Sequence, residues 1–172
     1  MEIGVIAIHK CKVEESNRKY IMNNKSFTTS FLVDQTPEDV FNSINNVRGW
    51  WSGEIKGDTD KLGKEFTYRV PNAHYSKQKI TEFIEGKKIV WHVLDASLTF
   101  VKNKDEWKGS DIIFEISRND DKTKVNFTHK GLVPEYECYN ACSNAWNMLI
   151  NGNLRSLIIT GLVQPSPWES KI

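Results

Sequence analysis

The longest hydrophobic pattern in the chain lies near its C-terminal end, from Glu137 to about Thr160. Apolar residues recur there at steps of three and four, a spacing that places them along one side of an α-helix: Tyr139, Cys142, Trp146, Leu149, Ile150, Leu154, Leu157 and Ile158. A helix of about 24 residues is roughly 36 Å long, so its apolar side needs an equally long partner surface. We expect a curved antiparallel sheet wrapped around the helix, an arrangement that often leaves a cavity between the two.

The segments before this helix alternate apolar and polar residues, which is typical of half-buried β-strands. Turn sequences at 85–88 and 119–122 separate neighbouring segments, so a meander of antiparallel strands is the simplest topology. The predicted strands cover 27–33, 64–70, 77–84 and 89–94, a segment around 98–101 within the long connection 95–108, and two segments around 112–116 and 125–129.

A short helix is predicted directly after the first strand. Thr36 can cap its free N–H groups, Pro37 suits the first helical position, and Glu38 and Asp39 favour the positive end of the helix dipole. Its inner face is formed by Val40, Phe41, Ile44 and Val47. The helix is predicted to end near Gly49, which leaves Trp50 and Trp51 in a turn or a second short helix.

The chain of 172 residues fits one domain, which we place at 25–163, with a tail at 164–172. Residues 1–24 are an N-terminal extension of different character. They form either an additional edge strand or a mis-called start, because Met22 stands just before the first clear strand.

Composition narrows the possible partners. The chain carries 23 Lys and Arg against 22 Asp and Glu, a net charge of +1, so nucleic acid is not an expected partner. No apolar run reaches the ~18 residues of a membrane-spanning helix, and the N-terminus lacks the features of a secretory signal. We therefore expect a cytoplasmic protein without an integral membrane segment.

The three cysteines, Cys11, Cys138 and Cys142, are too few for a disulfide framework, so reduced thiols are expected. Cys138 and Cys142 lie four apart on the predicted helix, but a metal would need further ligands from elsewhere, and Cys142 fits better as a small buried residue. We predict no metal and no cofactor. The sequence also contains no nucleophile elbow, phosphate-binding loop, zinc motif or dinucleotide fingerprint, and we assign no catalytic residue.

The order of these features resembles a known superfamily. The features are the Thr36–Phe41 helix start, Trp50-Trp51, the run of strands, the segment 124–132, and a Trp146-containing helix that ends near Gly161. Together they are similar to the START-like superfamily, also called SRPBCC or Bet v 1-like helix-grip proteins. Within it, the chain resembles stand-alone domains related to the activator of the heat-shock protein 90 ATPase.

This resemblance implies an α+β helix-grip fold. A curved antiparallel sheet would wrap around the long C-terminal helix, with two short helices after the first strand and an internal pocket for an apolar ligand. It does not imply one activity, because such folds serve unrelated functions.

Alternation and helical phase predict which residues face such a pocket. The candidates are mostly aromatic and aliphatic, since these suit a planar or sterol-like ligand. His129 shares a strand face with Val125 and Phe127, and a core role is favoured for it over a catalytic one. The candidate ligand-binding residues are Trp50, Trp51, Tyr68, Trp91, Phe114, Phe127, His129, Tyr139, Trp146, Leu149, Ile150, Asn153 and Leu157.

Three functional hypotheses follow from the sequence. The first is a binding protein for a small apolar or aromatic molecule, lipids included, whose pocket is dry and lies between sheet and helix. The second is a protein-interaction module, with a chaperone or another protein as partner, whose exposed apolar patch lies around Trp50-Trp51 or Trp107. The third is a cofactor-independent cyclase or hydrolase, which requires groups such as His74, Glu82 and His129 to converge. A monomer and a homodimer are both compatible with the sequence.

Overall fold

The computed structural model describes residues 26–165 of the chain. The predictions for the extension at 1–24, for Cys11 and for most of the tail concern positions outside this range. Among the described residues, no helix combines the length and the apolar character needed to cross a membrane.

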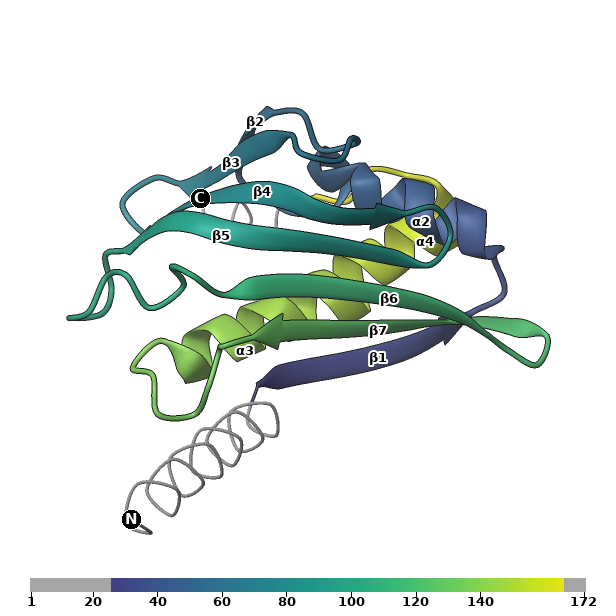
Figure 1. Ribbon diagram of the computed structural model, residues 1–172. Coiled ribbons are helices and arrows are strands. Elements are labelled where there is room, and N and C mark those ends of the chain that lie inside the picture. Colours follow the sequence, from purple (N-terminus) through teal and green to yellow (C-terminus); the bar gives the residue numbers. More distant parts are fainter. Residues whose placement is uncertain (1–25, 166–172) are drawn as a thin grey trace, which may run out of the picture.

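One antiparallel sheet of seven strands, in the order β1-β7-β6-β5-β4-β3-β2, forms the framework. All strands from β2 to β7 lie next to their sequence neighbours, and β1 closes the other edge by pairing with β7 (Figure 1). The strands are β1 (Phe27–Val33), β2 (Glu54–Gly57), β3 (Glu65–Val70), β4 (His74–Ile84), β5 (Lys88–Leu98), β6 (Asp111–Asn119) and β7 (Lys122–Lys130).

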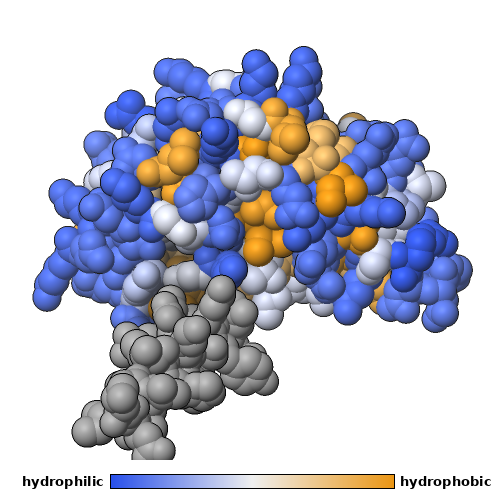
Figure 2. Space-filling model, viewed as in Figure 1, coloured by the Kyte–Doolittle hydropathy of each residue, from blue (hydrophilic) through white to orange (hydrophobic). Residues whose placement is uncertain are grey.

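Alternation along the strands sets the two faces of the sheet. On β7, for example, Val125, Phe127 and His129 are fully buried and their neighbours are partly exposed. In the view of Figure 2, hydrophilic residues cover most of the surface and hydrophobic ones form small patches between them. The apolar face of the sheet is therefore turned inward, where it meets the C-terminal helix.

The first helix forms as the sequence predicts. Helix α2 (Pro37–Asn45) begins with a capping box, in which the Thr36 hydroxyl accepts from the Asp39 N–H at 3.1 Å and the Asp39 carboxylate receives the Thr36 N–H. A short 3₁₀ helix, η1 (Val47–Gly49), follows directly. These two are the short helices after the first strand that the resemblance implied.

The C-terminal helix runs without a break through α3 (Tyr139–Asn147), the π-helical segment η2 (Met148–Leu154) and α4 (Arg155–Thr160). It ends at Gly161, whose φ of 70° is the left-handed conformation that favours glycine at a helix end. Figure 1 shows this helix lying along the sheet, with α2 beside its α4 end. The predicted single helix is confirmed, and the π-helical middle is a feature that the spacing of apolar residues does not show.

Three predictions about strands need correction. Strand β2 was not predicted, because its four residues carry only one buried side chain, Ile55. Strands β4 and β5 are longer than the predicted 77–84 and 89–94. The predicted strand around 98–101 is wrong: Leu98 is the last residue of β5, and the chain then turns so that the Leu98 N–H donates to the Lys104 carbonyl.

The connection from β5 to β6 shapes one end of the molecule. Strand β6 pairs with β5 only from Lys88 to His92, so the later part of β5 has no β6 partner. The connection 99–110 lies there instead, held by the bonds from the Val93 N–H to the Ser110 carbonyl and from the Gly109 N–H to the Val93 carbonyl. This brings the connection next to α3.

Candidate functional site

A cavity of about 320 Å³ lies between α3 and the end of the sheet that carries β3 and the start of β4. Its lining comes from five parts of the chain: the segment after η1, the β3–β4 hairpin, the β5–β6 connection, α3 and η2. The lining residues are Trp51, Tyr68, Val70, Ala73, His74, Phe100, Trp107, Ala141, Cys142, Ala145, Trp146 and Leu149. Apolar side chains dominate this list, as in most small-molecule sites.

Small residues on the helix leave the space that the cavity occupies. Ala141, Cys142 and Ala145 lie on the side of α3 that faces the cavity, next to the large Trp146. At the outer end, Phe100 is 49% exposed. The cavity therefore has a closed aromatic end and an end near solvent.

Trp107 contributes a weakly satisfied hydrogen-bond donor to this lining. Its side chain is 4% exposed, and its indole N–H interacts with the Cys142 sulfur, a weak acceptor, and has no oxygen or nitrogen acceptor. The ring is held between His74 and His129, with centroid distances of 4.5 Å to each, and it stacks on Trp146 at 5.6 Å. A buried N–H whose acceptor is only a thiol sulfur is weakly satisfied, so a stronger acceptor in place of that sulfur would be favourable.

His129 belongs to the support of the cavity, not to its lining. It is fully buried, its Nδ1 accepts from the Trp146 Nε1–H at 3.0 Å, and its Nε2 lies 2.8 Å from the Ser110 hydroxyl. Because that hydroxyl donates to the Trp107 carbonyl, Nε2 carries the ring proton and donates to Ser110. Burial lowers the pKa of His129 to about 3, so the ring is neutral at neutral pH.

His74 is the polar side chain on the opposite side of Trp107. Its Nε2 lies 3.0 Å from the Ser76 hydroxyl, which also accepts from the Gln78 amide. Burial lowers the pKa of His74 to about 3, so this ring is also neutral. Glu82, by contrast, pairs with Lys88 at 2.9 Å and does not line the cavity. The convergence of His74, Glu82 and His129 that an enzyme of this type would need is therefore not present.

The two described cysteines, Cys138 and Cys142, are buried free thiols. Their hydrogen bond raises the pKa of Cys138 and lowers the pKa of Cys142, so the two thiols act as a pair. Cys142 lines the cavity, and Cys138 lies outside the lining. Within residues 26–165, no group of three or more His, Cys, Asp or Glu side chains is arranged to hold a metal ion.

The structure places the sequence-predicted candidates in two groups. Trp51, Tyr68, Trp146 and Leu149 line the cavity together. The other candidates lie outside the lining, and most of them fill the interior between sheet and helix. Asn153 donates its amide N–H to the Trp50 carbonyl at 3.1 Å. This second group comprises Trp50, Trp91, Phe114, Phe127, His129, Tyr139, Ile150, Asn153 and Leu157.

Aromatic packing explains why the cavity is confined to one end. Trp51 stacks on Tyr68 at 4.2 Å and on Trp91 at 5.8 Å, and Phe114 meets both Trp91 and Phe127 edge to face. These rings occupy the middle of the space between sheet and helix, where the sequence alone predicted the pocket. The exposed patch expected around Trp50-Trp51 or Trp107 is wrong, since these three side chains are 1%, 2% and 4% exposed.

No protein-family model matches the sequence, and no curated protein matches it significantly. Solved structures do match in fold. The Aha1 dimer from Colwellia psychrerythraea gives a TM-score of 0.64 at 19% identity, over 79% of this chain and 97% of that one. The protein SSP2350 from Staphylococcus saprophyticus gives 0.60 at 16% identity, over 82% and 96%.

A third solved structure carries a functional description of its own. PFC0360w from Plasmodium falciparum, described as an HSP90 activator, gives a TM-score of 0.54 at 20% identity, over 80% of this chain and 97% of that one. At these identities the likeness concerns the fold. The chain has the α+β helix-grip fold of Aha1-type, START-like proteins.

Proposed function

We propose that this protein binds a small apolar or aromatic molecule in the cavity between α3 and the sheet. The observation that carries the proposal is an aromatic-lined space of about 320 Å³ in an otherwise filled interior. Cavities of roughly 300–1,000 Å³ are the usual size for small-molecule sites. The lining is apolar and one end of the cavity is near solvent, so an apolar occupant is favoured because it removes that surface from water.

The chemistry of the lining narrows the ligand class. Trp51, Trp107 and Trp146 offer ring faces and edges for planar groups. The Trp107 N–H, whose acceptor is only the weak one of the Cys142 sulfur, suits a ligand with one carbonyl, ether or ring-nitrogen acceptor. We infer a compact aromatic molecule with a single acceptor, because a long lipid chain would exceed the space that the central tryptophans leave.

Native mass spectrometry of protein purified from its own host tests this proposal. We expect a co-purifying small molecule near one-to-one stoichiometry, and its identity after extraction gives the ligand class. In a thermal-shift screen, a matching aromatic compound at about 100 times its Kd adds about 2.7 kcal/mol to the free energy of unfolding. An empty protein with no thermal shift across an aromatic and lipid library would contradict the proposal.

A second candidate is an interaction with a chaperone. It is favoured by the fold likeness to a protein described as an HSP90 activator. It is also favoured by three exposed apolar side chains at and just beyond the end of α4, namely Ile159, Leu162 and Val163. The test is the ATPase rate of heat-shock protein 90 with and without this protein. A rate increase that disappears in an Ile159→Ser variant would support it, and an unchanged rate would exclude it.

A further inference from the structure

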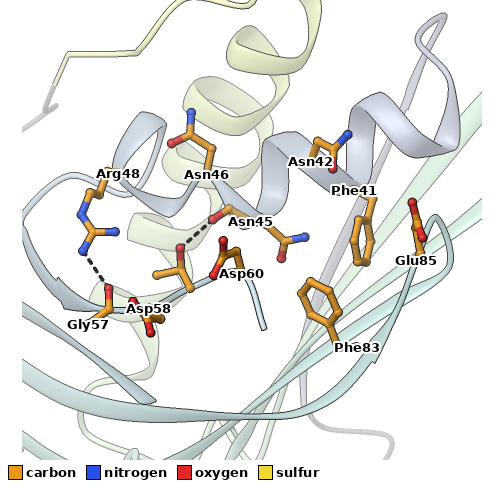
Figure 3. A pocket seen from close by; sticks show the side chains of 11 residues that line it. Phe41, Asn42, Asn45, Asn46, Arg48, Gly57, Asp58, Asp60, Phe83 and Glu85 are labelled. Carbon is orange, nitrogen blue, oxygen red and sulfur yellow. Dashed lines mark hydrogen bonds between the residues drawn. The ribbon is translucent and has the colours of Figure 1, made fainter. Parts of the chain in front are cut away.

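A second hollow shares no lining residue with the aromatic cavity. This hollow, of about 750 Å³, is formed by α2, the loop 57–60 that follows β2, and the end of β4 with its turn. Figure 3 shows its lining side chains, which are largely polar. They are Phe41, Asn42, Asn45, Asn46, Arg48, Gly57, Asp58, Thr59, Asp60, Phe83 and Glu85. We call it the α2 groove.

The charges of the α2 groove do not balance. It contains three carboxylates, and its one cation, Arg48, is already bound to the carbonyls of Gly57 at 2.9 Å and Ile55 at 3.3 Å. Asp58 is partly neutralised by Lys64, 3.6 Å away. Asp60 and Glu85 form no ion pair with any residue in the described part of the chain. The groove therefore has excess negative charge.

Asn45 provides an independent sign of a missing partner. Its side chain is 8% exposed, and its buried Oδ1 has no hydrogen-bond donor. Figure 3 shows the amide pointing from α2 into the groove, between Asp60 and Phe83. Leaving a buried acceptor unpaired costs about 1–3 kcal/mol, so a donor supplied from outside would remove this cost.

The groove also has a rigid base. The Thr59 hydroxyl donates to the Asn45 carbonyl at 2.8 Å and fixes the loop 57–60 against α2. Phe41 and Phe83 meet edge to face with a centroid distance of 4.9 Å. Carboxylates, an unpaired amide oxygen and aromatic rings thus lie in one preformed hollow.

We propose that the α2 groove binds the ammonium group of a small alkylamine. An ammonium has three N–H donors and no acceptor, which suits Asn45 Oδ1 and the Asp60 carboxylate beside it, and Glu85 adds negative charge on the other side of Phe41. Its alkyl chain fits against Phe41 and Phe83, whose ring faces also attract cations. The same group could come from a free diamine or from a lysine side chain, so the test includes both sources.

The test is an NMR titration, with calorimetry, of the full chain with putrescine, with a short lysine-containing peptide, and with 1-butanol as the uncharged control. We expect chemical-shift changes at Phe41, Asn45 and Phe83 with putrescine or the peptide, and none with butanol. If putrescine binds more tightly than the peptide, the ligand is a free diamine; if the peptide binds more tightly, it is a lysine side chain. Added salt should weaken the binding. No shifts up to about 10 mM amine, or equal shifts with butanol, would overturn the proposal.

Two variants locate the interaction. Asp60→Asn removes one carboxylate charge and should weaken binding roughly tenfold or more, whereas Asp121→Asn, in the exposed β6–β7 turn, should leave it unchanged. Asn45→Leu removes the unpaired oxygen, so it should weaken binding without lowering the melting temperature. If Asp60→Asn and Asn45→Leu both bind the amine as the natural protein does, the groove is not the site.

Discussion

At the residue scale, the cavity depends on a chain of buried polar contacts. The Trp146 indole donates to His129, His129 donates to Ser110, and Ser110 donates to the Trp107 carbonyl. These bonds fix two of the three tryptophans that line the cavity. The inward direction of His129 follows from alternation along its strand and is confirmed, but its partners are 17 and 19 residues away in sequence and could not be predicted.

The low pKa of His129 predicts how stability depends on pH. Its pKa is 6.5 in the unfolded chain and about 3 in the fold, so between these values the unfolded chain binds more protons. The contribution of this histidine is therefore fully present above pH 6.5 and is lost as the pH falls towards 3, by about 1.4 kcal/mol per pH unit. His129→Gln should reduce the pH slope of the free energy of unfolding by about one proton between pH 6 and 4.

Urea unfolding at several pH values measures this slope, and NMR of the His129 ring gives an independent check. Because only the slope is compared, any constant loss of stability in the variant does not affect the result. The ring signals should not titrate between pH 7 and about 4.5. Titration near pH 6.5, or an unchanged slope in His129→Gln, would contradict the assignment of a neutral core histidine.

At the element scale, the start of α3 depends on a side chain from the β5–β6 connection. The Glu106 carboxylate accepts from the N–H groups of Glu137 and Cys138, both at 2.9 Å, and Glu106 is 8% exposed. Free N–H groups at a helix start need such acceptors. The interaction also joins the two elements that carry Trp107 and Cys142.

Glu106→Ala should therefore lower the free energy of unfolding by about 1–3 kcal/mol, because two backbone N–H groups, one of them buried, lose their acceptor. Asp105→Ala is the matched control, since Asp105 is exposed and adjacent. Chemical denaturation of the two variants gives the comparison. Equal stability of Glu106→Ala and Asp105→Ala would show that the carboxylate does not hold the helix start.

Strand β2 depends on a glycine that the backbone geometry requires. Gly57 has a φ of 103°, and a Cβ there would clash with the backbone oxygen of Glu65 on β3. Gly63 has a φ of 79°, but a Cβ there would meet open space. Gly63→Ala should lower the free energy of unfolding by roughly 1–3 kcal/mol, through backbone strain alone. Gly57→Ala should lower it by more, because the clash adds to the strain. Thermal unfolding of both variants is the measurement, and an equal loss would contradict the clash.

The elements themselves differ in how predictable they are from sequence. The C-terminal helix and α2 follow from periodicity and capping residues, since both signals are local. The course of the connection 99–110 is held by hydrogen bonds to distant parts of the chain, so local patterns do not show it, and nothing in the apolar spacing marks the π-helical segment at 148–154. Trp107, one of the places predicted for an exposed patch, is instead buried by contacts with His74, His129 and Trp146.

At the scale of the whole molecule, the helix-grip architecture is predictable but the position of its cavity is not. Sequence reasoning identified the correct space, between sheet and helix, yet not how much of it Trp50, Trp91, Phe114 and Phe127 fill. The lining residues that it missed are of two kinds: small helix residues, such as Ala141 and Ala145, and residues of turns and connections, such as Ala73 and Phe100. Only the assembled fold brings these together.

The central claim is that the aromatic cavity is the binding site, and a pair of variants on one helix tests it most directly. Ala145→Leu should fill part of the cavity, whereas Asn144→Leu adds the same side chain at a neighbouring, exposed position of α3. The measurement is the affinity of both variants for the molecule that co-purifies or that gives the largest thermal shift.

We predict that Ala145→Leu loses roughly tenfold or more in affinity, while Asn144→Leu binds as the natural protein does. Overpacking costs Ala145→Leu about 1–3 kcal/mol at most, so circular dichroism should show both variants folded. If Ala145→Leu is folded and binds with unchanged affinity, the ligand lies elsewhere and the account of the cavity is wrong.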